Sequence, residues 1–160
     1  MKRFLVVSDI HVPRYQRDVP ERFYRLSKEV DGIIALGDYV TLDTVLTLQA
    51  IAKAFYGVHG NADRIDVKEY LPDSKVIVIE NLTIALTHGW GPPWDLRERI
   101  YKKFIDVPDI DVFLYGHTHE AFDGFEHGKR FLNPGAAIPG GTYAIMTIVG
   151  SDLEFEIQHL

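Results

Sequence analysis

Hydrophobic and polar positions along the chain follow two alternating periods. Short apolar runs that end in Gly, Asp or His occur at 3–9 (RFLVVSD), 32–38 (GIIALGD), 54–61 (AFYGVHGN) and 112–119 (VFLYGHTH). Between them, apolar residues recur at helical spacing in 20–30 (PERFYRLSKEV), 42–52 (LDTVLTLQAIA) and 94–105 (WDLRERIYKKFI). This alternation of strand and helix predicts parallel βαβ units.

Three other segments have the pattern of β-hairpins. In 75–89 two strand-like runs meet at Glu80-Asn81, in 121–135 they meet at His127-Gly128-Lys129, and in 142–160 the chain turns at 150–152. Hairpins pair antiparallel and βαβ units pair parallel, so the sheets should be mixed. We expect an α/β fold in which two mixed sheets pack on each other with helices outside, forming a single domain over residues 1–160.

Composition excludes several classes of protein. The 160 residues carry 17 Lys and Arg against 23 Asp and Glu, a formal net charge of -6, which disfavours general nucleic-acid binding. The absence of cysteine excludes disulfides and thiolate metal sites. No apolar stretch is long enough to span a bilayer, and the start MKRFLVVSD enters a strand-like run instead of a signal peptide. We therefore expect a cytoplasmic protein with no membrane association.

Side chains that bind metals follow the predicted strands. Ligands of α/β sheets bind at the carboxyl ends of parallel strands, so these residues should meet at one edge. Each alone is also typical of a turn or a helix cap, but the conjunction favours a site. Oxygen and imidazole donors together suit Mn, Fe, Zn, Co or Ni better than Ca or Mg. The set is Asp9, His11, Asp38, Asn61, His88, His117 and His119.

The spacing of the two histidines in GHTH predicts two ions. Residues two apart on an extended segment project to the same side, with Cα atoms roughly 6.5 Å apart, while paired catalytic metals lie about 3.5–4 Å apart. His117 and His119 can therefore each bind a different metal, and Asp9 and His11 can converge on one. Asp38 can give one oxygen to each ion as a bridge. Positions left open for water and substrate are typical of a catalytic metal site.

The ordered series D-x-H, GD, GN-x-D, HG and GHTH resembles that of the calcineurin-like metallophosphoesterases, and NPG after GHTH resembles their small prokaryotic phosphodiesterase branch. The resemblance covers about residues 4–135. It implies a four-layer αββα sandwich and two metal ions with a hydroxide between them. One ion would take Asp9, His11, Asp38 and His119, and the other would take Asp38, Asn61, His88 and His117.

The chain departs from the family pattern at four places. Many members have His after the ligand Asn, as a proton donor to the leaving group, and the small branch often has Cys, but this chain has Ala62. GDYVTLD lacks the Asp-Arg-Gly of the serine/threonine protein phosphatases. Val12-Pro13 follows D-x-H where a small residue is common, and Ala136 replaces the Ser after NPG. Substitutions at the last two places can reshape the mouth of the site without removing a ligand.

Other residues near the motifs leave two interpretations open. His59 is a candidate catalytic acid if the chain is extended there, and otherwise an exposed loop histidine. Trp90 and Trp94 either stack on a base or aryl leaving group or pack under their loop. His127, His159 and the segment RERIYKK are expected to be solvent-exposed, without a role in the site.

The function expected from these residues is metal-dependent phosphodiester hydrolysis. The cofactors would be two divalent transition-metal ions, with Mn the first choice and Fe, Zn, Ni or Co as alternatives, and the substrate a small phosphoester, including nucleotide-like ones. A phosphomonoesterase would need extra cationic groups, for which only Arg14 and Arg64 lie near motif ends. A further alternative is a protein-interaction module, as in the retromer subunit that resembles these enzymes. The oligomeric state stays open.

Overall fold

Two five-stranded sheets form the centre of the molecule. The computed structural model describes all residues, 1–160. The first sheet has the order β10 (Asp152–His159), β9 (Thr142–Val149), β1 (Lys2–Val7), β2 (Gly32–Ala35) and β3 (Phe55–Gly57). The second has the order β4 (Ser74–Ile79), β5 (Leu82–Thr87), β6 (Val112–Leu114), β8 (Lys129–Asn133) and β7 (Phe122–Glu126).

Both sheets are mixed, as the sequence predicts. β1, β2 and β3 run parallel, and β9 and β10 are antiparallel additions at one side. In the second sheet β5, β6 and β8 run parallel, with β4 and β7 antiparallel at the two edges. The three predicted hairpins are β4–β5, β7–β8 and β9–β10, and their turns fall at the predicted positions.

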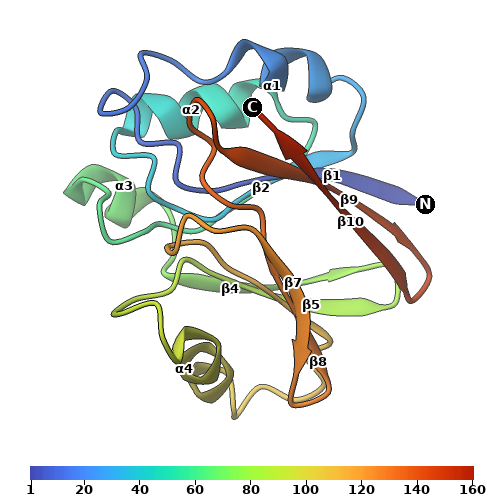
Figure 1. Cartoon of the computed structure of the whole chain (residues 1–160). Coiled ribbons are helices and arrows are strands. Elements are labelled where there is room, and N and C mark those ends of the chain that lie inside the picture. Colours follow the sequence, from blue (N-terminus) through green and yellow to red (C-terminus); the bar gives the residue numbers. More distant parts are fainter.

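Helices cover the outer faces of both sheets, which gives the four-layer αββα sandwich (Figure 1). On the first sheet lie α1 (Glu21–Leu26), α2 (Leu42–Ile51) and α3 (Ile65–Tyr70), and on the second lies α4 (Leu96–Lys103). Three of them fall within the predicted helical segments, but the sequence pattern missed α3. It is only six residues long, and Val67 is its one fully buried residue, so no apolar periodicity marks it.

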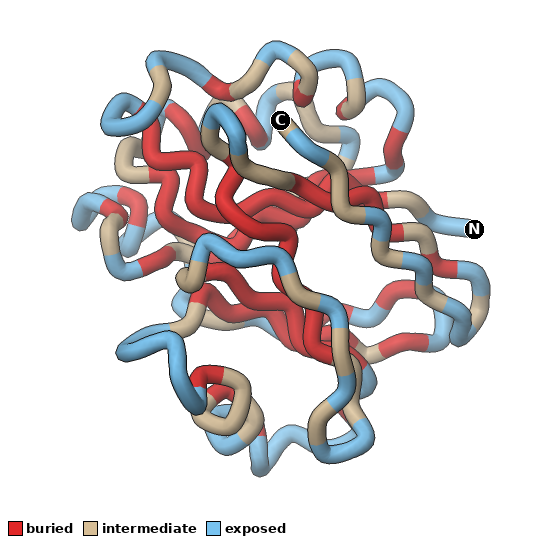
Figure 2. Tube along the Cα trace, viewed as in Figure 1, coloured by how far each residue is buried: buried red, intermediate tan, exposed pale blue.

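Alternation along the strands separates the layers of the core. In β1, Phe4 and Val6 point between the sheets, while Leu5 and Val7 point toward the helices. Buried residues therefore concentrate in the two sheets and in the loops that follow β1 and β2, and most other connecting loops are exposed (Figure 2). No helix is both long and apolar enough to cross a membrane. The rigid sheets fix the positions of the loops that follow their carboxyl ends.

Candidate metal centre

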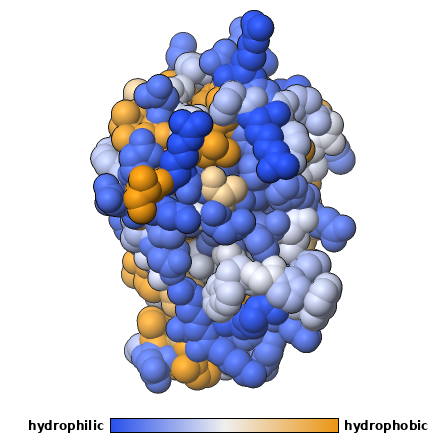
Figure 3. Space-filling model, turned by 90° about the vertical axis from the view of Figure 1, so that its left-hand side faces the viewer, coloured by the Kyte–Doolittle hydropathy of each residue, from blue (hydrophilic) through white to orange (hydrophobic).

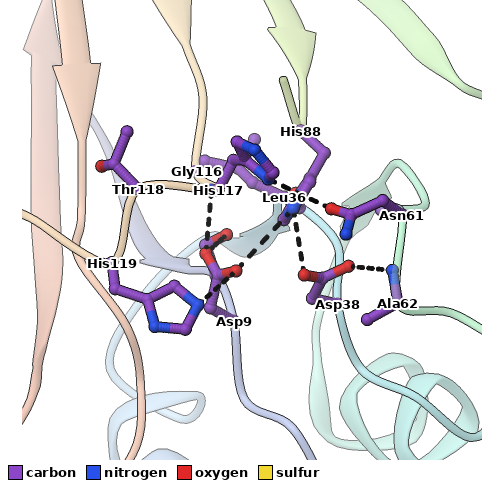
Figure 4. A network of polar contacts seen from close by, with 12 residues as sticks. Asp9, Leu36, Asp38, Asn61, Ala62, His88, Gly116, His117, Thr118 and His119 are labelled. Carbon is purple, nitrogen blue, oxygen red and sulfur yellow. Dashed lines mark hydrogen bonds and ion pairs between the residues drawn. The ribbon is translucent and has the colours of Figure 1, made fainter. Parts of the chain in front are cut away.

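Loops at one end of the two sheets bring together the candidate ligands predicted from the sequence. Asp9 and His11 follow β1, Asp38 follows β2, and Asn61 follows β3. His88 follows β5 in the second sheet, and the GHTH histidines follow β6. In Figure 4 the side chains of the labelled ligands converge from both sheets on one small volume. The face of the molecule at this end is mostly hydrophilic (Figure 3).

Asp9 holds one carboxylate oxygen in place and presents the other to the imidazoles. Its Oδ2 accepts hydrogen bonds from Ser8 Oγ at 2.6 Å and from the His117 backbone N–H at 3.1 Å. Its Oδ1 lies 3.2 to 3.7 Å from the Nε2 atoms of three histidines: His119, His11 and His88. Asp9 is fully buried. Burial acts to raise its pKa, but the imidazoles of His11 and His119 together hold it well below the usual range.

Asp38 is arranged in the same way on the other side of the centre. Its Oδ1 accepts a hydrogen bond from the Ala62 backbone N–H at 2.8 Å. Its Oδ2 lies 3.1 Å from His88 Nε2 and 3.7 Å from His11 Nε2. The sequence-based expectation gave each oxygen of Asp38 to a different ion. Because Oδ1 faces Ala62, a bridge through Asp38 would use Oδ2 alone, and its bridging role stays a prediction.

The ring of His88 is fixed by a backbone carbonyl. Its Nδ1 lies 2.6 Å from the Leu36 oxygen, to which it donates, so Nε2 faces the two carboxylates. Burial lowers the pKa of this imidazole, but its close contact with the Asp38 carboxylate and the charges of Asp9 and Asp38 outweigh burial and raise it to about 9. Contact with Asp9 also raises the pKa of His119. Both histidines thus respond to a concentrated negative charge.

His117 and Asn61 form a separate pair of donors. His117 Nε2 lies 2.7 Å from the Gly91 oxygen, and Nδ1 lies 3.1 Å from Asn61 Oδ1. A neutral imidazole that donates to Gly91 has its lone pair on Nδ1, beside the lone pairs of the Asn61 oxygen. Two lone-pair atoms in this arrangement suit a shared cation. His117 and His119 therefore face different parts of the centre, with Asn61 and Asp9 as their respective neighbours.

Several buried polar atoms at the centre have no hydrogen-bond partner. They are Asp9 Oδ1, both ring nitrogens of His11, and His88 Nε2. Buried polar groups are almost always paired, so this concentration in one place needs an explanation. The sets Asp9/His11/His119 and Asp9/Asp38/His88 each bring their ligand atoms within 4.8 Å of one another. The residues present therefore fit bound cations, with Asp9 common to both sets.

The backbone at the centre differs from the extended segments expected from the sequence. Five of the seven candidate ligands have positive φ: Asp9 (55°), His11 (48°), Asp38 (58°), His117 (72°) and His119 (66°). β1 ends at Val7 and β6 at Leu114, so D-x-H and H-x-H lie in the loops beyond the strands. The expectation of an extended i, i+2 pair was therefore wrong, because left-handed residues, and not strand pleating, aim these side chains.

Two of the motif glycines are explained by side chains of neighbouring loops that lie close to the glycine backbone. A Cβ atom at Gly60 would lie 2.2 Å from Asp38 Oδ1, and one at Gly116 would lie 2.0 Å from Ser8 Oγ. Asp63 is the last residue of the GN-x-D motif, where no role was expected for it, and it ties the same loops together. Its carboxylate accepts backbone N–H groups of Asp38 at 3.0 Å, Val40 at 2.7 Å and Gly60 at 2.7 Å. Ser8 was not predicted to take part, since a lone Ser carries no distinctive spacing.

Of the three residues with two open interpretations, His59 and Trp90 lie at a cavity beside the centre. His59 is half-buried, its Nδ1 is buried without a partner, and it lines this cavity together with Asn61 and His88. Its catalytic role stays a prediction. Trp90 and Trp94 are 42% and 69% exposed, so neither packs under its loop. Only Trp90 lines the cavity.

His127 is exposed, as expected, but both it and the segment RERIYKK make contacts that the sequence did not indicate. The His127 ring stacks on Tyr101 with centroids 3.9 Å apart, and its Nε2 lies 2.5 Å from Glu98 Oε2, which lowers the pKa of Glu98. The charged residues of RERIYKK are also engaged. Arg97 pairs with Glu126, and Arg99 donates to backbone carbonyls of the Trp90 loop. These contacts form because the β7–β8 hairpin packs beside α4, which brings the polar turn of the hairpin against the charged face of the helix.

Comparison with known proteins agrees with this arrangement. A probable metallophosphoesterase of Methanothermobacter thermautotrophicus is 30% identical over 156 residues, covering 95% of this chain and 89% of that protein. A Thermotoga maritima protein determined by NMR in solution is 49% identical with a TM-score of 0.82, covering 100% of both chains. A mutant of Vps29 from Entamoeba histolytica is 26% identical with a TM-score of 0.76, covering 99% of both chains.

The family comparison covers nearly the whole chain. The model described as the calcineurin-like phosphoesterase superfamily domain matches residues 1–153, which include all seven candidate ligands. The matched region contains both sheets except the last part of β10. This family match explains the order of the motifs, the αββα sandwich and the donors at one edge of it. The chain belongs to the calcineurin-like phosphoesterase superfamily.

Proposed function

We propose that the chain is a phosphodiesterase that works with two divalent transition-metal ions. The observation that carries the proposal is the pair of buried carboxylates, Asp9 and Asp38, each with one oxygen anchored by hydrogen bonds and the other turned toward imidazole nitrogens. A centre built only for stability would have its buried polar atoms paired within the protein. Here the unpaired atoms converge.

The chain's residues divide naturally between two ions. Asp9, His11 and His119 would hold one, and Asp38, His88, Asn61 and His117 would hold the other, with the facing carboxylate oxygens shared. Two ions bound here would supply an activated water as nucleophile and neutralise charge on the nonbridging phosphate oxygens. The chain's part is to fix the donors. Leu36 orients His88, Gly91 orients His117, and Asp63 holds the Asp38 loop against the Asn61 loop.

The donor set indicates which ions are suitable. It combines carboxylate and amide oxygens with imidazole nitrogens and contains no thiolate. Such mixed sets bind Mn, Fe, Co, Ni or Zn, and availability then decides among them. We propose Mn as the working ion, because the carboxylate and amide oxygens, together with the water and phosphate oxygens that would complete the shells, suit Mn within this series.

Two alternatives make different predictions. A phosphomonoesterase would hydrolyse p-nitrophenyl phosphate in preference to a diester. A protein-interaction module, suggested by the similarity to Vps29, would bind metal without turning over either substrate. The complete set of seven candidate ligands supports hydrolysis over a purely structural role for the ions.

The experiment measures metal content and hydrolysis on the same protein. The purified chain is loaded with Mn, its metals are counted, and bis(p-nitrophenyl) phosphate is compared with p-nitrophenyl phosphate. We expect about two ions per chain and preference for the diester. Asp38→Asn keeps an oxygen for the Ala62 N–H but loses the charge, so metal content should fall and turnover should drop more than about 100-fold.

The matched control is Asp43→Asn, on the exposed surface of α2, which should behave as wild type. A preference for the monoester would show that the chain is a phosphomonoesterase and not a phosphodiesterase. Two bound metals with no hydrolysis of either compound would favour the interaction module.

A further inference from the structure

A polar cavity of about 170 Å³ adjoins the metal centre. Asn61 and His88 belong to both, so a substrate held at the centre would extend directly into the cavity. Its other walls come from α3, from the end of α4 and from the loop that follows β5, on the same side of the molecule as the centre (Figure 1). The side chains that define it are His59, Lys68, Asp73, Trp90 and Lys103.

The wall formed by Trp90 is held rigidly. Arg99 donates to the backbone oxygens of Trp90 at 2.8 Å and Trp94 at 2.9 Å, and also to that of Pro92. Gly91 is bound in addition by His117 Nε2. A loop with this many contacts to its carbonyl groups is preorganised, and preorganisation lowers the cost of binding a ligand.

The cavity has an excess of positive charge in an acidic protein. Lys103 lies 2.7 Å from Asp73 and 5.2 Å from the Trp90 ring centroid, so its charge is largely compensated. Lys68 forms no ion pair or side-chain hydrogen bond and its ammonium is free. Trp90 is the single hydrophobic side chain of the lining. The charges of Lys103 and Asp73 cancel, and Lys68 leaves the cavity with one positive charge in excess. The whole chain, in contrast, has a formal net charge of -6.

We propose that this cavity binds a second anionic group of the substrate, separate from the phosphate at the metal centre. The inference rests on the proposed function for its reaction and adds the substrate class: small phosphodiesters that carry a further phosphate or carboxylate. Lys68 supplies the charge, and Lys103 shifts from Asp73 to the ligand when the anion is present. Asp73 limits the affinity because it repels the same anion.

Binding tests the proposal without turnover. The Mn-loaded protein is titrated calorimetrically with thymidine 3′,5′-bisphosphate and with thymidine 5′-monophosphate at one ionic strength. We expect the bisphosphate to bind about fivefold to tenfold tighter, the effect of one favourable charge contact at a partly exposed site. Lys68→Gln should bring the ratio of the two dissociation constants near one. Asp73→Asn should increase the ratio above that of wild type.

Lys102→Gln is the matched control. Lys102 lies next to Lys103 on α4, its side chain is 72% exposed, and it does not line the cavity, so the ratio should stay as in wild type. Equal affinity of wild type for both nucleotides, or an equal effect of Lys68→Gln and Lys102→Gln, would overturn the proposal. Failure of the loaded protein to hydrolyse any diester would overturn the proposed function alone, since the ratio of dissociation constants is measured without hydrolysis.

Discussion

At the scale of single residues, the centre uses backbone conformations that most side chains avoid. Asp9, Asp38 and His119 are among five candidate ligands with positive φ. Asp and His tolerate this region better than bulky or branched residues, yet each such residue costs about 1 kcal/mol or more. The cost persists only where surrounding contacts fix the conformation, which is typical of functional sites. The periodicity of a sequence contains no signal for it, and this is why the expected extended geometry was wrong.

His59 is the residue whose proposed role is most open to a direct test. It lies on the cavity wall with Asn61 and His88, and Ala62 has no proton to donate. If His59 protonates the leaving group, His59→Ala should slow a diester with an alkyl or nucleoside leaving group by about 10²- to 10⁴-fold. A diester with a nitrophenol leaving group should lose much less, because nitrophenolate leaves without a proton. The measurement is kcat for both diesters in wild type and variant.

Equal losses on the two diesters would show that His59 acts on binding or packing and not as an acid. Unchanged rates on both would exclude it from the reaction. His159→Ala is the control. His159 is exposed on β10, and β10 and β3 are the two opposite edge strands of the first sheet. The His59 loop follows β3, so His159 lies far from it in the sheet.

At the scale of elements, the centre depends on contacts between loops that follow different strands. Asp63 joins the loop after β2 to the loop after β3 through three backbone N–H groups, and it is buried. Asp38 and Asn61 sit on these two loops. A change at Asp63 should therefore affect both stability and metal binding, although Asp63 itself does not face the centre.

Asp63→Asn tests this link with a substitution of the same shape. One amide nitrogen replaces an accepting oxygen, so at least one buried N–H loses its partner, at a cost of about 1–3 kcal/mol in the free energy of unfolding. Mn affinity should fall as well, because Asp38 is no longer held. Denaturant unfolding of the metal-free protein and Mn titration measure the two effects. Asp43→Asn should change neither, and a stable Asp63→Asn variant with normal Mn affinity would contradict the argument.

Most of the secondary-structure elements, but not all, could be predicted from the sequence. The strands, the three hairpins and the candidate ligands at the strand ends were predictable, because apolar runs that stop at Asp, Asn or His carry a strong local signal. α3 and the lysines around the cavity were not predictable. Lys68 lies on a helix with almost no apolar pattern, and Lys103 looks like any charged residue of an exposed helix face. The contact of His127 with α4 was not predictable either, since it depends on packing between distant segments.

At the scale of the whole molecule, metal binding and folding stability are linked through protons. In the metal-free protein, Asp38 and Asp9 raise the pKa of His88 to about 9. This is above the ordinary imidazole value of about 6.5. The stabilising contribution of charged His88 is therefore fully present below about pH 6.5 and is lost as the pH rises through about 9. A metal ion needs the neutral imidazole and so competes with this proton.

Mn affinity should therefore rise with pH over the range in which His88 is protonated. Below pH 9 each bound ion that uses His88 displaces its proton, so the association constant should increase about tenfold per pH unit between pH 6 and 8. The raised pKa of His119 adds to the slope. Calorimetry in two buffers of different ionisation enthalpy counts the protons released, and we expect about one or more per metal-loaded chain. His127→Ala removes a histidine that lies in the β7–β8 turn, against α4 and not at the centre, so its slope should equal that of wild type. An affinity independent of pH, with no proton released, would mean that His88 is already neutral when the metal binds and that the carboxylates do not hold its proton.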